Sequence, residues 1–395
     1  MHLAYLHYLY GRSTALLHVE QFAAAARQLG HRVDVHAMNL APPPLAAGGP
    51  QKASSMALKV RQALKSRFSR YLHDPKEAYW NLRYVRREKA LLAPDPPDVL
   101  LVRSQGLAAS CVPVARHLEI PLVLEVNAPT EELTRYIDRY VHWTTLRRRV
   151  GAYKLRAADA IVVVSTALKD YYIERLGIDP DKITVAVNGA DVDLFTPRVA
   201  PDAEFPKEPG APWIGYVGSF QKWHALDFLG SLVRRVGARR PRTRFMMVGS
   251  GPGAEDVRRS ADVPSERLVF TGRVEHQRVP HLVASLDIGV LAEAASYQCP
   301  LKVIEWMAAG KAIVAPAYGP LRDLIDDGVH GILFEPGNLD ALVEAVIALV
   351  DDPERRVELG RAAAARAHES LSWRDNARTV VAACERAARR RGAGR

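Results

Sequence analysis

Lys302 and Glu305 stand three residues apart in the segment 300–311, which is predicted to form a helix that ends at a glycine before the apolar run 312–315. Residues at this spacing share one face of a helix, so the ammonium and the carboxylate point the same way. An ammonium can hold a diphosphate, and a carboxylate can accept hydrogen bonds from both hydroxyls of a ribose. The pair therefore indicates a nucleotide-diphosphate ligand, whereas the plain alternative is a weak surface ion pair.

Glycine-bearing loops follow several predicted strands, and their backbone N–H groups could approach a phosphate closely. In open parallel sheets, ligands bind at the carboxyl ends of the strands, so we expect these loops and the Lys302 helix on that edge. Each loop taken alone is an ordinary turn, and it is their number that favours a ligand site. They contain Gly11 with Arg12, Gly218 with Ser219, Lys222 and His224, Gly249, and Arg273 with Val274.

The elements that position these loops are short apolar runs alternating with amphipathic stretches, a pattern typical of a parallel sheet with helices on both faces. The alternation stops between residues 197 and 212, where prolines recur, and then restarts. An α/β protein with two doubly wound domains is therefore predicted. Its buried strands are expected at 3–9, 32–37, 98–102, 121–126, 160–164, 183–187, 213–217, 244–248, 268–270, 288–291, 312–314 and 331–334.

The length of 395 residues also favours two domains over one. The predicted division is an N-terminal domain over 1–196, a proline-rich linker over 197–212 and a C-terminal domain over 213–370. A final helix over 371–395 is expected to pack back on the N-terminal domain.

The amino-acid composition limits the classes of protein to which this chain can belong. No apolar run reaches the ~18 residues that a membrane span requires, and residues 1–5 lack the features of a signal peptide. The three cysteines are far apart and odd in number, which indicates a reducing compartment and no zinc site. We therefore expect a cytoplasmic protein. Its net charge of +10 indicates an anionic partner, such as nucleotide phosphates, acidic lipids or nucleic acid.

The positive charge gathers between residues 52 and 89, which hold eleven Lys or Arg against Asp74, Glu77 and Glu88. Apolar residues recur between the basic ones at helical spacing. The plain interpretation is a solvated helix packed on the N-terminal domain. The alternative is a surface that contacts an anionic membrane at the inner face, or a lipid-phosphate acceptor.

At this point the chain resembles the GT-B-fold glycosyltransferases of the retaining family 4. The resemblance is carried by Pro300-x-Lys302-x-x-Glu305-x-Met307-Ala308-x-Gly310, by the loop 216–220 with Trp223 and His224, by 187–191 before 195–197, and by 125–129. It implies two Rossmann-like domains facing a central cleft, with the nucleotide sugar on the C-terminal domain and the acceptor on the N-terminal one. The acceptor would be a glycan, a lipid-linked sugar or a small molecule, and the anomeric configuration would be retained.

The resemblance also implies roles for single residues. Glu305 would hold the ribose, Lys302 and the loop with Gly218, Ser219 and Lys222 would hold the diphosphate, and Arg273 with Val274 would flank the base. Gly11, Gly249 and Tyr297 complete the expected donor-binding set. Arg12, Glu125 and Asn127 are expected to bind the acceptor, and Asn127, His224 and Lys302 form the expected catalytic set.

Four positions depart from the family pattern. Tyr297 stands where the first glutamate of the usual pair, eight residues before Glu305, would touch the donor sugar. Ser219 and His224 stand where the phosphate loop usually has an arginine and a lysine, and Gly11 alone replaces a double glycine. The identity of the sugar is therefore open.

The sequence thus predicts a sugar transferase that uses a UDP-sugar in preference to a GDP-sugar. No metal or other cofactor is expected, because no Asp-x-Asp pair lies in a plausible loop after a predicted strand, and the pair Asp191 and Asp193 follows an Asn-Gly turn. Two alternatives remain: an epimerase or hydrolase of UDP-sugars on the same fold, and a non-catalytic protein that binds nucleic acid or membrane. The glycine loops would have no purpose in a nucleic-acid-binding protein, so nucleic acid is not an expected partner.

Overall fold

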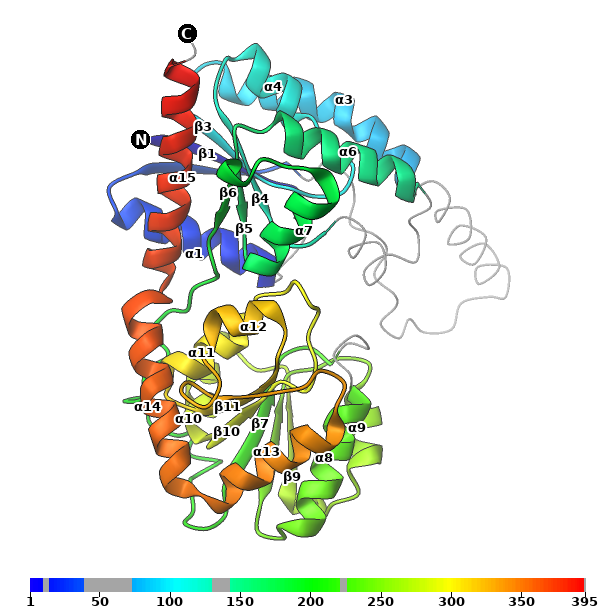
Figure 1. Cartoon of the computed structure of the whole chain (residues 1–395), viewed down its shortest axis with the longest axis vertical. Coiled ribbons are helices and arrows are strands. Elements are labelled where there is room, and N and C mark those ends of the chain that lie inside the picture. Colours follow the sequence, from blue (N-terminus) through cyan, green and yellow to red (C-terminus); the bar gives the residue numbers. More distant parts are fainter. Residues whose placement is uncertain (10–13, 39–72, 130–142, 221–225, 394–395) are drawn as a thin grey trace. The chain divides into compact units, whose positions relative to one another are not determined.

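A computed structural model describes residues 1–9, 14–38, 73–129, 143–220 and 226–393. The chain divides into two compact units (Figure 1). Unit 1 comprises Met1–Val164, Leu168–Ala186 and Ala377–Arg395, and unit 2 comprises Ser165–Ala167 and Val187–Asn376. Each unit has one six-stranded sheet, and every strand pair within these sheets is parallel. The prediction of two doubly wound parallel sheets is confirmed.

The sheet of unit 1 has the strand order β2-β1-β3-β4-β5-β6, and apolar runs such as Val99–Arg103 are buried along almost their whole length. Its strands are β1 (His2–His7), β2 (Arg32–Ala37), β3 (Val99–Arg103), β4 (Leu122–Val126), β5 (Ala160–Val163) and β6 (Ile183–Val185). Its helices are α1 (Thr14–Gln28), α3 (His73–Leu92), α4 (Cys111–His117), α6 (Thr144–Ala157) and α7 (Thr166–Leu176), with most of α15 (Trp373–Ala393).

The sheet of unit 2 has the strand order β12-β11-β10-β7-β8-β9. Its strands are β7 (Trp213–Val217), β8 (Arg244–Val248), β9 (Leu268–Gly272), β10 (Ile288–Val290), β11 (Ala312–Pro316) and β12 (Ile332–Phe334). Its helices are α8 (Leu226–Arg239), α9 (Ala254–Ala261), α10 (Val279–Ser285), α11 (Leu301–Ala308), α12 (Gly319–Leu324), α13 (Leu339–Asp351) and α14 (Pro353–Ser370). All twelve predicted strands are present, with ends within two residues of the expected ones.

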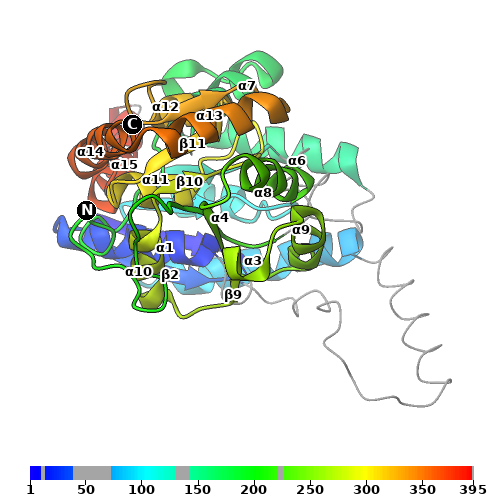
Figure 2. The same ribbon diagram turned by 90° about the horizontal axis from the view of Figure 1, so that it is seen from below.

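The core of unit 2 fixes the position of α11 on the sheet. Trp306 on α11 is completely buried, and a Cβ atom at Gly289 of β10 would lie 2.7 Å from its indole ring. Glycine is therefore required at this point for the helix to approach the strand. Elsewhere in unit 2, α8 and α9 pack side by side (Figures 1 and 2).

The proline-rich segment 197–212 lies in unit 2 and is fastened to it. Arg278 donates to Asp202 at 2.7 Å, Lys207 pairs with Asp287 at 2.9 Å, and Trp213 Nε1 donates to the carbonyl of Pro206. The chain passes from unit 1 to unit 2 earlier, at Ala186–Val187, and returns at Asn376–Ala377 inside α15. Prolines here reduce the conformational freedom of a packed connection rather than create a loose one.

None of the helices in the described ranges combines the length and the apolar character that crossing a membrane would need.

Candidate functional site

The strand order of unit 2 reverses between β7 and β10. From β7 the chain proceeds outward through β8 and β9, and then returns to build β10, β11 and β12 on the other side. At such a reversal the connections leave on opposite faces of the sheet, and the carboxyl ends of the two central strands border a crevice in which ligands bind. The loop after β7 and the helix after β10, α11, are therefore the elements that this topology assigns to a ligand.

Three glycines bring the loops after β7, β8 and β9 into backbone contact. The N–H of Gly218 donates to the carbonyl of Val248 at 2.9 Å, and the N–H of Gly249 donates to that of Gly272 at 3.0 Å. Gly249 has φ +123°, and a Cβ atom there would lie 2.0 Å from the carbonyl oxygen of Gly218. Only glycine allows both that dihedral angle and that approach.

Lys302 extends from the first turn of α11 to the end of β7. Its Nζ donates to the hydroxyl of Tyr216 at 3.2 Å and lies 4.2 Å from the centroid of that ring. A Cβ atom at Gly218, whose φ is +148°, would lie 2.5 Å from this Nζ. The Tyr216 hydroxyl in turn donates to the carbonyl of Ser219 at 2.9 Å. The ammonium is thus placed on the backbone of the glycine loop.

Lys302 and Glu305 are enclosed by protein but keep part of their surface open to solvent. Burial lowers the pKa of Lys302 to about 8 and raises the pKa of Glu305 to about 7, and the charge of each residue offsets only part of the shift of the other. Among the described residues, no hydrogen bond or ion pair engages the Glu305 carboxylate. An enclosed and unpaired carboxylate can accept hydrogen bonds from a ligand.

The remaining donor-site predictions divide into three groups. Gly218, Ser219, Gly249 and Lys302 come together as described. Arg273 is exposed just beyond β9, and Tyr297 lies in the turn between β10 and α11, where its carbonyl accepts from Ser165 Oγ at 3.3 Å. No hydrogen bond in the described part of the chain joins Arg273, Val274 or Tyr297 to Lys302 or Glu305. Gly11, Arg12, Lys222 and His224 lie outside the described residues.

In unit 1, Glu125 of β4 is the centre of a buried polar network. Its carboxylate accepts from the Tyr5 hydroxyl, from Arg103 Nη1 at 2.5 Å and from Asn127 Nδ2 at 2.7 Å, and the residue is 4% exposed. Burial alone would raise the pKa of Glu125, but His18, Arg103 and these hydrogen bonds hold it below its usual value. The carboxylate oxygens of Glu125 are thus engaged by three side chains, two of which, Arg103 and Asn127, lie beside it in the network. That Glu125 also contacts the acceptor stays a prediction.

Asn127 has a different status from Glu125. Its amide nitrogen is held by Glu125, but its Oδ1 atom is buried and has no hydrogen-bond partner among the described residues. A buried acceptor without a donor costs free energy, so such an atom favours a ligand that brings a hydroxyl. The prediction that Asn127 binds an acceptor is compatible with this geometry.

Two residues of these sites were missed by the sequence analysis. Tyr216 lies inside the buried strand β7, where a tyrosine is an ordinary core residue. The local sequence therefore gives no sign that its hydroxyl accepts a hydrogen bond from Lys302. Arg103 ends β3 in the same way. Its link to Glu125 follows from the register that places these two residues opposite each other in the parallel sheet, and only the register could have found it.

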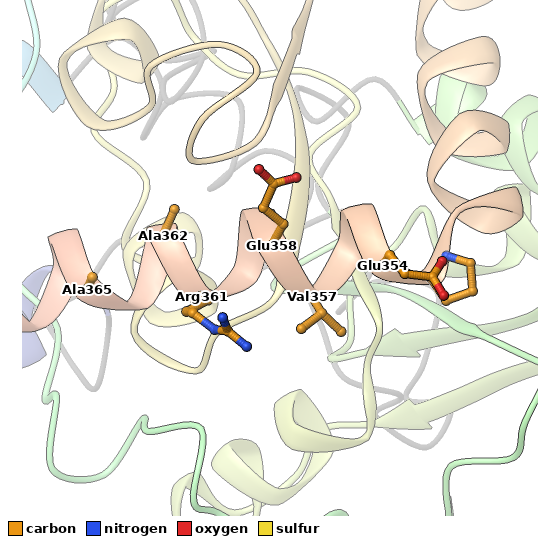
Figure 3. Close-up of a pocket in the computed structure, with 7 residues that line it drawn as sticks. Glu354, Val357, Glu358, Arg361, Ala362 and Ala365 are labelled. Carbon is orange, nitrogen blue, oxygen red and sulfur yellow. The ribbon is translucent and has the colours of Figure 1, made fainter.

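A cavity of about 690 Å³ lies on α14 (Figure 3). Residues of that helix line it, among them Val357, Arg361 and Ala365, and none of the predicted site residues is among them. It is not part of the site at the ends of β7 and β10.

Two family models match this chain. A model of glycosyltransferase family 4 matches residues 17–194, and a model of the glycosyl transferases of group 1 matches residues 211–352. The first match falls mainly on unit 1, and the second lies within unit 2.

Curated relatives are similar over roughly two thirds of the chain. A sulfoquinovosyl transferase of Arabidopsis thaliana is 27% identical over 294 residues, which are 70% of this chain and 54% of that protein. A 2-deoxystreptamine N-acetyl-D-glucosaminyltransferase of Streptomyces fradiae is 28% identical over 73% of this chain and 70% of its own length. A D-inositol 3-phosphate glycosyltransferase of Corynebacterium aurimucosum is 31% identical over 65% and 63%. The chain thus spans about half the length of the plant relative.

Solved structures are similar over almost the whole chain. HepE of Anabaena in complex with UDP has a TM-score of 0.70 at 16% identity and covers 97% of this chain and 99% of its own. A sucrose-phosphate synthase of Thermosynechococcus elongatus has a TM-score of 0.73 at 17% identity and covers 97% and 98%. At these identities the likeness shows a shared fold.

Proposed function

Because this chain belongs to glycosyltransferase family 4 and has the GT-B fold, we propose that it transfers a sugar from a nucleotide-diphosphate sugar to an acceptor hydroxyl. The observation that carries the proposal is the Lys302 ammonium placed on the Gly218 loop, with the Glu305 carboxylate, which no described residue engages, one helical turn further along. A diphosphate and a ribose differ in charge and hydrogen-bonding character, and these two side chains match that difference.

In the bound donor, Glu305 accepts from the ribose hydroxyls while Lys302 and the N–H groups of the glycine loops face the diphosphate. We propose UDP as the nucleotide in preference to GDP. Support comes from the similar fold of Anabaena HepE, which is known in complex with UDP. The departure at Tyr297 from the family pattern leaves the sugar itself open.

The reaction breaks the bond between the anomeric carbon and the diphosphate oxygen, and the electron pair leaves with the phosphate. Lys302 stabilises the charge that develops on this leaving group, an effect that is strong in an enclosed site. The acceptor oxygen forms the new bond to the anomeric carbon, and its proton passes to the departing phosphate oxygen. Such a transfer needs no separate side-chain base. Its main requirement is that donor and acceptor are held close together in the correct orientation.

The acceptor hydroxyl is proposed to be bound in unit 1 by Asn127. Its buried Oδ1 receives no hydrogen bond from the part of the chain that the structure describes, and Glu125 fixes the orientation of the amide. Two of the relatives are named for polyhydroxylated acceptors, 2-deoxystreptamine and inositol 3-phosphate. An acceptor rich in hydroxyl groups suits the open oxygen of Asn127.

The proposal is tested by donor binding to the purified protein. A thermal-shift series with UDP-, GDP-, ADP- and dTDP-sugars identifies the donor, since a ligand at about 100 times its dissociation constant adds about 2.7 kcal/mol of stability. Glu305→Gln is expected to weaken that ligand, whereas Glu354→Gln, on an exposed helical position of the same unit, leaves its affinity unchanged. Equal donor affinity in both variants would contradict the role of Glu305.

We also propose that the diphosphate is neutralised by Lys302 and backbone amides without a metal ion. Turnover is then expected to persist in EDTA. Activity that disappears in EDTA and returns with Mg²⁺ or Mn²⁺ would overturn this part of the proposal. Release of free sugar in the absence of any acceptor would instead indicate a hydrolase or epimerase.

A further inference from the structure

Helices α3 and α6 of unit 1 present basic side chains to solvent. Their first turns are joined by Arg147, which donates to Asp74 at 2.6 Å and to Glu77 at 2.5 Å, and by the N–H of Trp143, which donates to Asp74 at 2.8 Å. We call their exposed side chains the α3–α6 face. Its basic members are Lys76, Arg83, Arg86, Arg87, Arg148, Arg149 and Arg156.

The acidic residues of these helices are turned inward. Asp74 is 1% exposed and Glu77 shares Arg147 with it, while the completely buried Glu88 accepts from the hydroxyls of Tyr8 and Ser110. Helix α6 has no acidic residue in its sequence. Within residues 74–92 and 143–157, no exposed side chain is acidic. The α3–α6 face is therefore more strongly positive than the composition of the segment suggests.

Large apolar side chains are exposed among these arginines. Leu82 is 68% exposed and Tyr79 58% exposed on α3, and Trp143, Leu146 and Tyr153 are 40–44% exposed on α6. These five account for most of the large exposed hydrophobic residues in the described part of the chain. Isolated exposed leucines need no explanation, but a group of them with tryptophan and tyrosine on adjoining helices marks an interaction surface.

We propose that the α3–α6 face docks on the surface of an anionic lipid bilayer. Arginines attract acidic headgroups, and tryptophan and tyrosine prefer the boundary between headgroups and acyl chains. Burying exposed leucines in that boundary is favourable in free energy, whereas contact with the phosphate backbone of a nucleic acid does not bury them. A bilayer therefore matches the face better than a nucleic acid does. The face belongs to unit 1 and does not depend on the donor site of unit 2.

The charge part of the proposal is tested by sedimentation of the whole protein with vesicles. Binding is expected on vesicles that contain phosphatidylglycerol and not on phosphatidylcholine alone, and it falls between about 0.15 M and about 1 M salt. Each basic residue near the surface contributes about a fivefold factor. Arg83→Gln with Arg86→Gln is therefore expected to weaken partitioning about 25-fold.

A matched control removes the same charge elsewhere. Arg258 and Arg259 are exposed on α9 of unit 2, and Arg258→Gln with Arg259→Gln changes the net charge equally. This control is expected to partition within about twofold of the unchanged protein. Thermal unfolding of both double variants verifies that each is folded. Equal losses in the two double variants would show a response to net charge alone and would overturn the proposal.

The apolar part is tested with a polarity-sensitive fluorophore on a single introduced cysteine. The three native cysteines are buried, and burial raises the pKa of each to about 12, so they do not compete for the label in the folded protein. A label at Leu82→Cys is expected to shift its emission to the blue on anionic vesicles. A label at Val357→Cys, at a similarly exposed position on α14, is expected to keep its emission.

Three results would overturn the proposal. The first is equal partitioning onto neutral and anionic vesicles. The second is a label at position 82 that stays in water while the protein sediments with the vesicles. The third is binding to RNA or DNA that requires Arg83 and Arg86 in the absence of any binding to vesicles.

Discussion

At the scale of residues, the site of unit 2 rests on two side chains whose pKa values are shifted toward each other. Burial lowers the pKa of Lys302 to about 8 and raises the pKa of Glu305 to about 7. Each residue is therefore close to the pH at which it loses its charge in the absence of ligand. A diphosphate stabilises the charged form of the lysine, and ribose hydroxyls stabilise that of the glutamate.

Donor affinity is consequently expected to be highest between about pH 7 and pH 8. Below this window Glu305 becomes protonated and loses charge-assisted hydrogen bonds, and above it Lys302 becomes neutral and releases the diphosphate. Titration calorimetry across pH measures both limbs. Glu305→Gln should abolish the acidic limb and leave the alkaline one. An affinity that is constant from pH 6 to pH 9 would exclude the assignment of both groups.

Gly218 sets the position of Lys302, and its replacement is expected to displace the ammonium. In Gly218→Ala the new methyl group would lie 2.5 Å from Nζ and 3.2 Å from Cε, so the flexible end of the lysine must move. We expect donor affinity to fall about tenfold, which corresponds to about 1.4 kcal/mol. Gly337→Ala is the control, because Gly337 also has a positive φ (+77°) but a methyl group added there would have no atom within 4 Å. It should lose stability without losing donor affinity.

At the scale of elements, the buried network of Glu125 ties three strands of unit 1 together. Tyr5 comes from β1, Arg103 from β3 and Glu125 from β4, and their side chains meet although the residues are as much as 120 positions apart. The acceptor contact predicted for Glu125 came from the family resemblance, whereas its partners across the sheet could not be predicted, because the sequence shows neighbours along the chain only. The strands themselves could be predicted, since apolar runs bounded by turn residues are a local signal.

The network makes a prediction about stability. Glu125→Leu leaves the Arg103 guanidinium buried without its counter-charge, so the free energy of unfolding is expected to fall by about 3–5 kcal/mol. Urea denaturation measures the loss. Arg103→Leu combined with Glu125→Leu should recover a large part of it, because the uncompensated charge is then removed. Additive losses in the double variant would show that the two residues are not coupled.

At the scale of the whole molecule, the two units were predictable from the restart of the strand–helix alternation, whereas their boundaries were not. The prolines of 197–212 predicted a linker between the two domains, but not the partners distant in sequence, such as Arg278 and Asp287, that hold this segment on unit 2. The inward orientation of Asp74 and Glu77 could not be predicted from the sequence either, because their partner Arg147 lies on a helix some seventy residues later. Long-range partners of this kind leave no trace in local composition.

The connection 197–212 is therefore expected to exchange its amide hydrogens slowly. The N–H of Asp202 donates to the carbonyl of His281 at 3.1 Å, and that of Ala211 donates to Glu208 at 3.1 Å. Protection close to that of unit 2 should be seen by hydrogen–deuterium exchange, and nucleotide should alter exchange near residues 186–187 more than within the connection. Fast exchange of the amide hydrogens of Asp202 and Ala211 would show that the connection is loose.

Helix α15 has a consequence for the order of events during synthesis. Unit 1 includes Ala377–Arg395, and the side chains of Ala383 and Cys384 are completely buried in it, while Arg391 donates to the carbonyl of Ile120 at 2.8 Å. Every strand of unit 2 has already been translated when these residues are made. Unit 1, whose strands are all translated first, is thus completed last. Until α15 emerges, the apolar surface that buries Ala383 and Cys384 stays uncovered in a nascent chain, where chaperones can bind it.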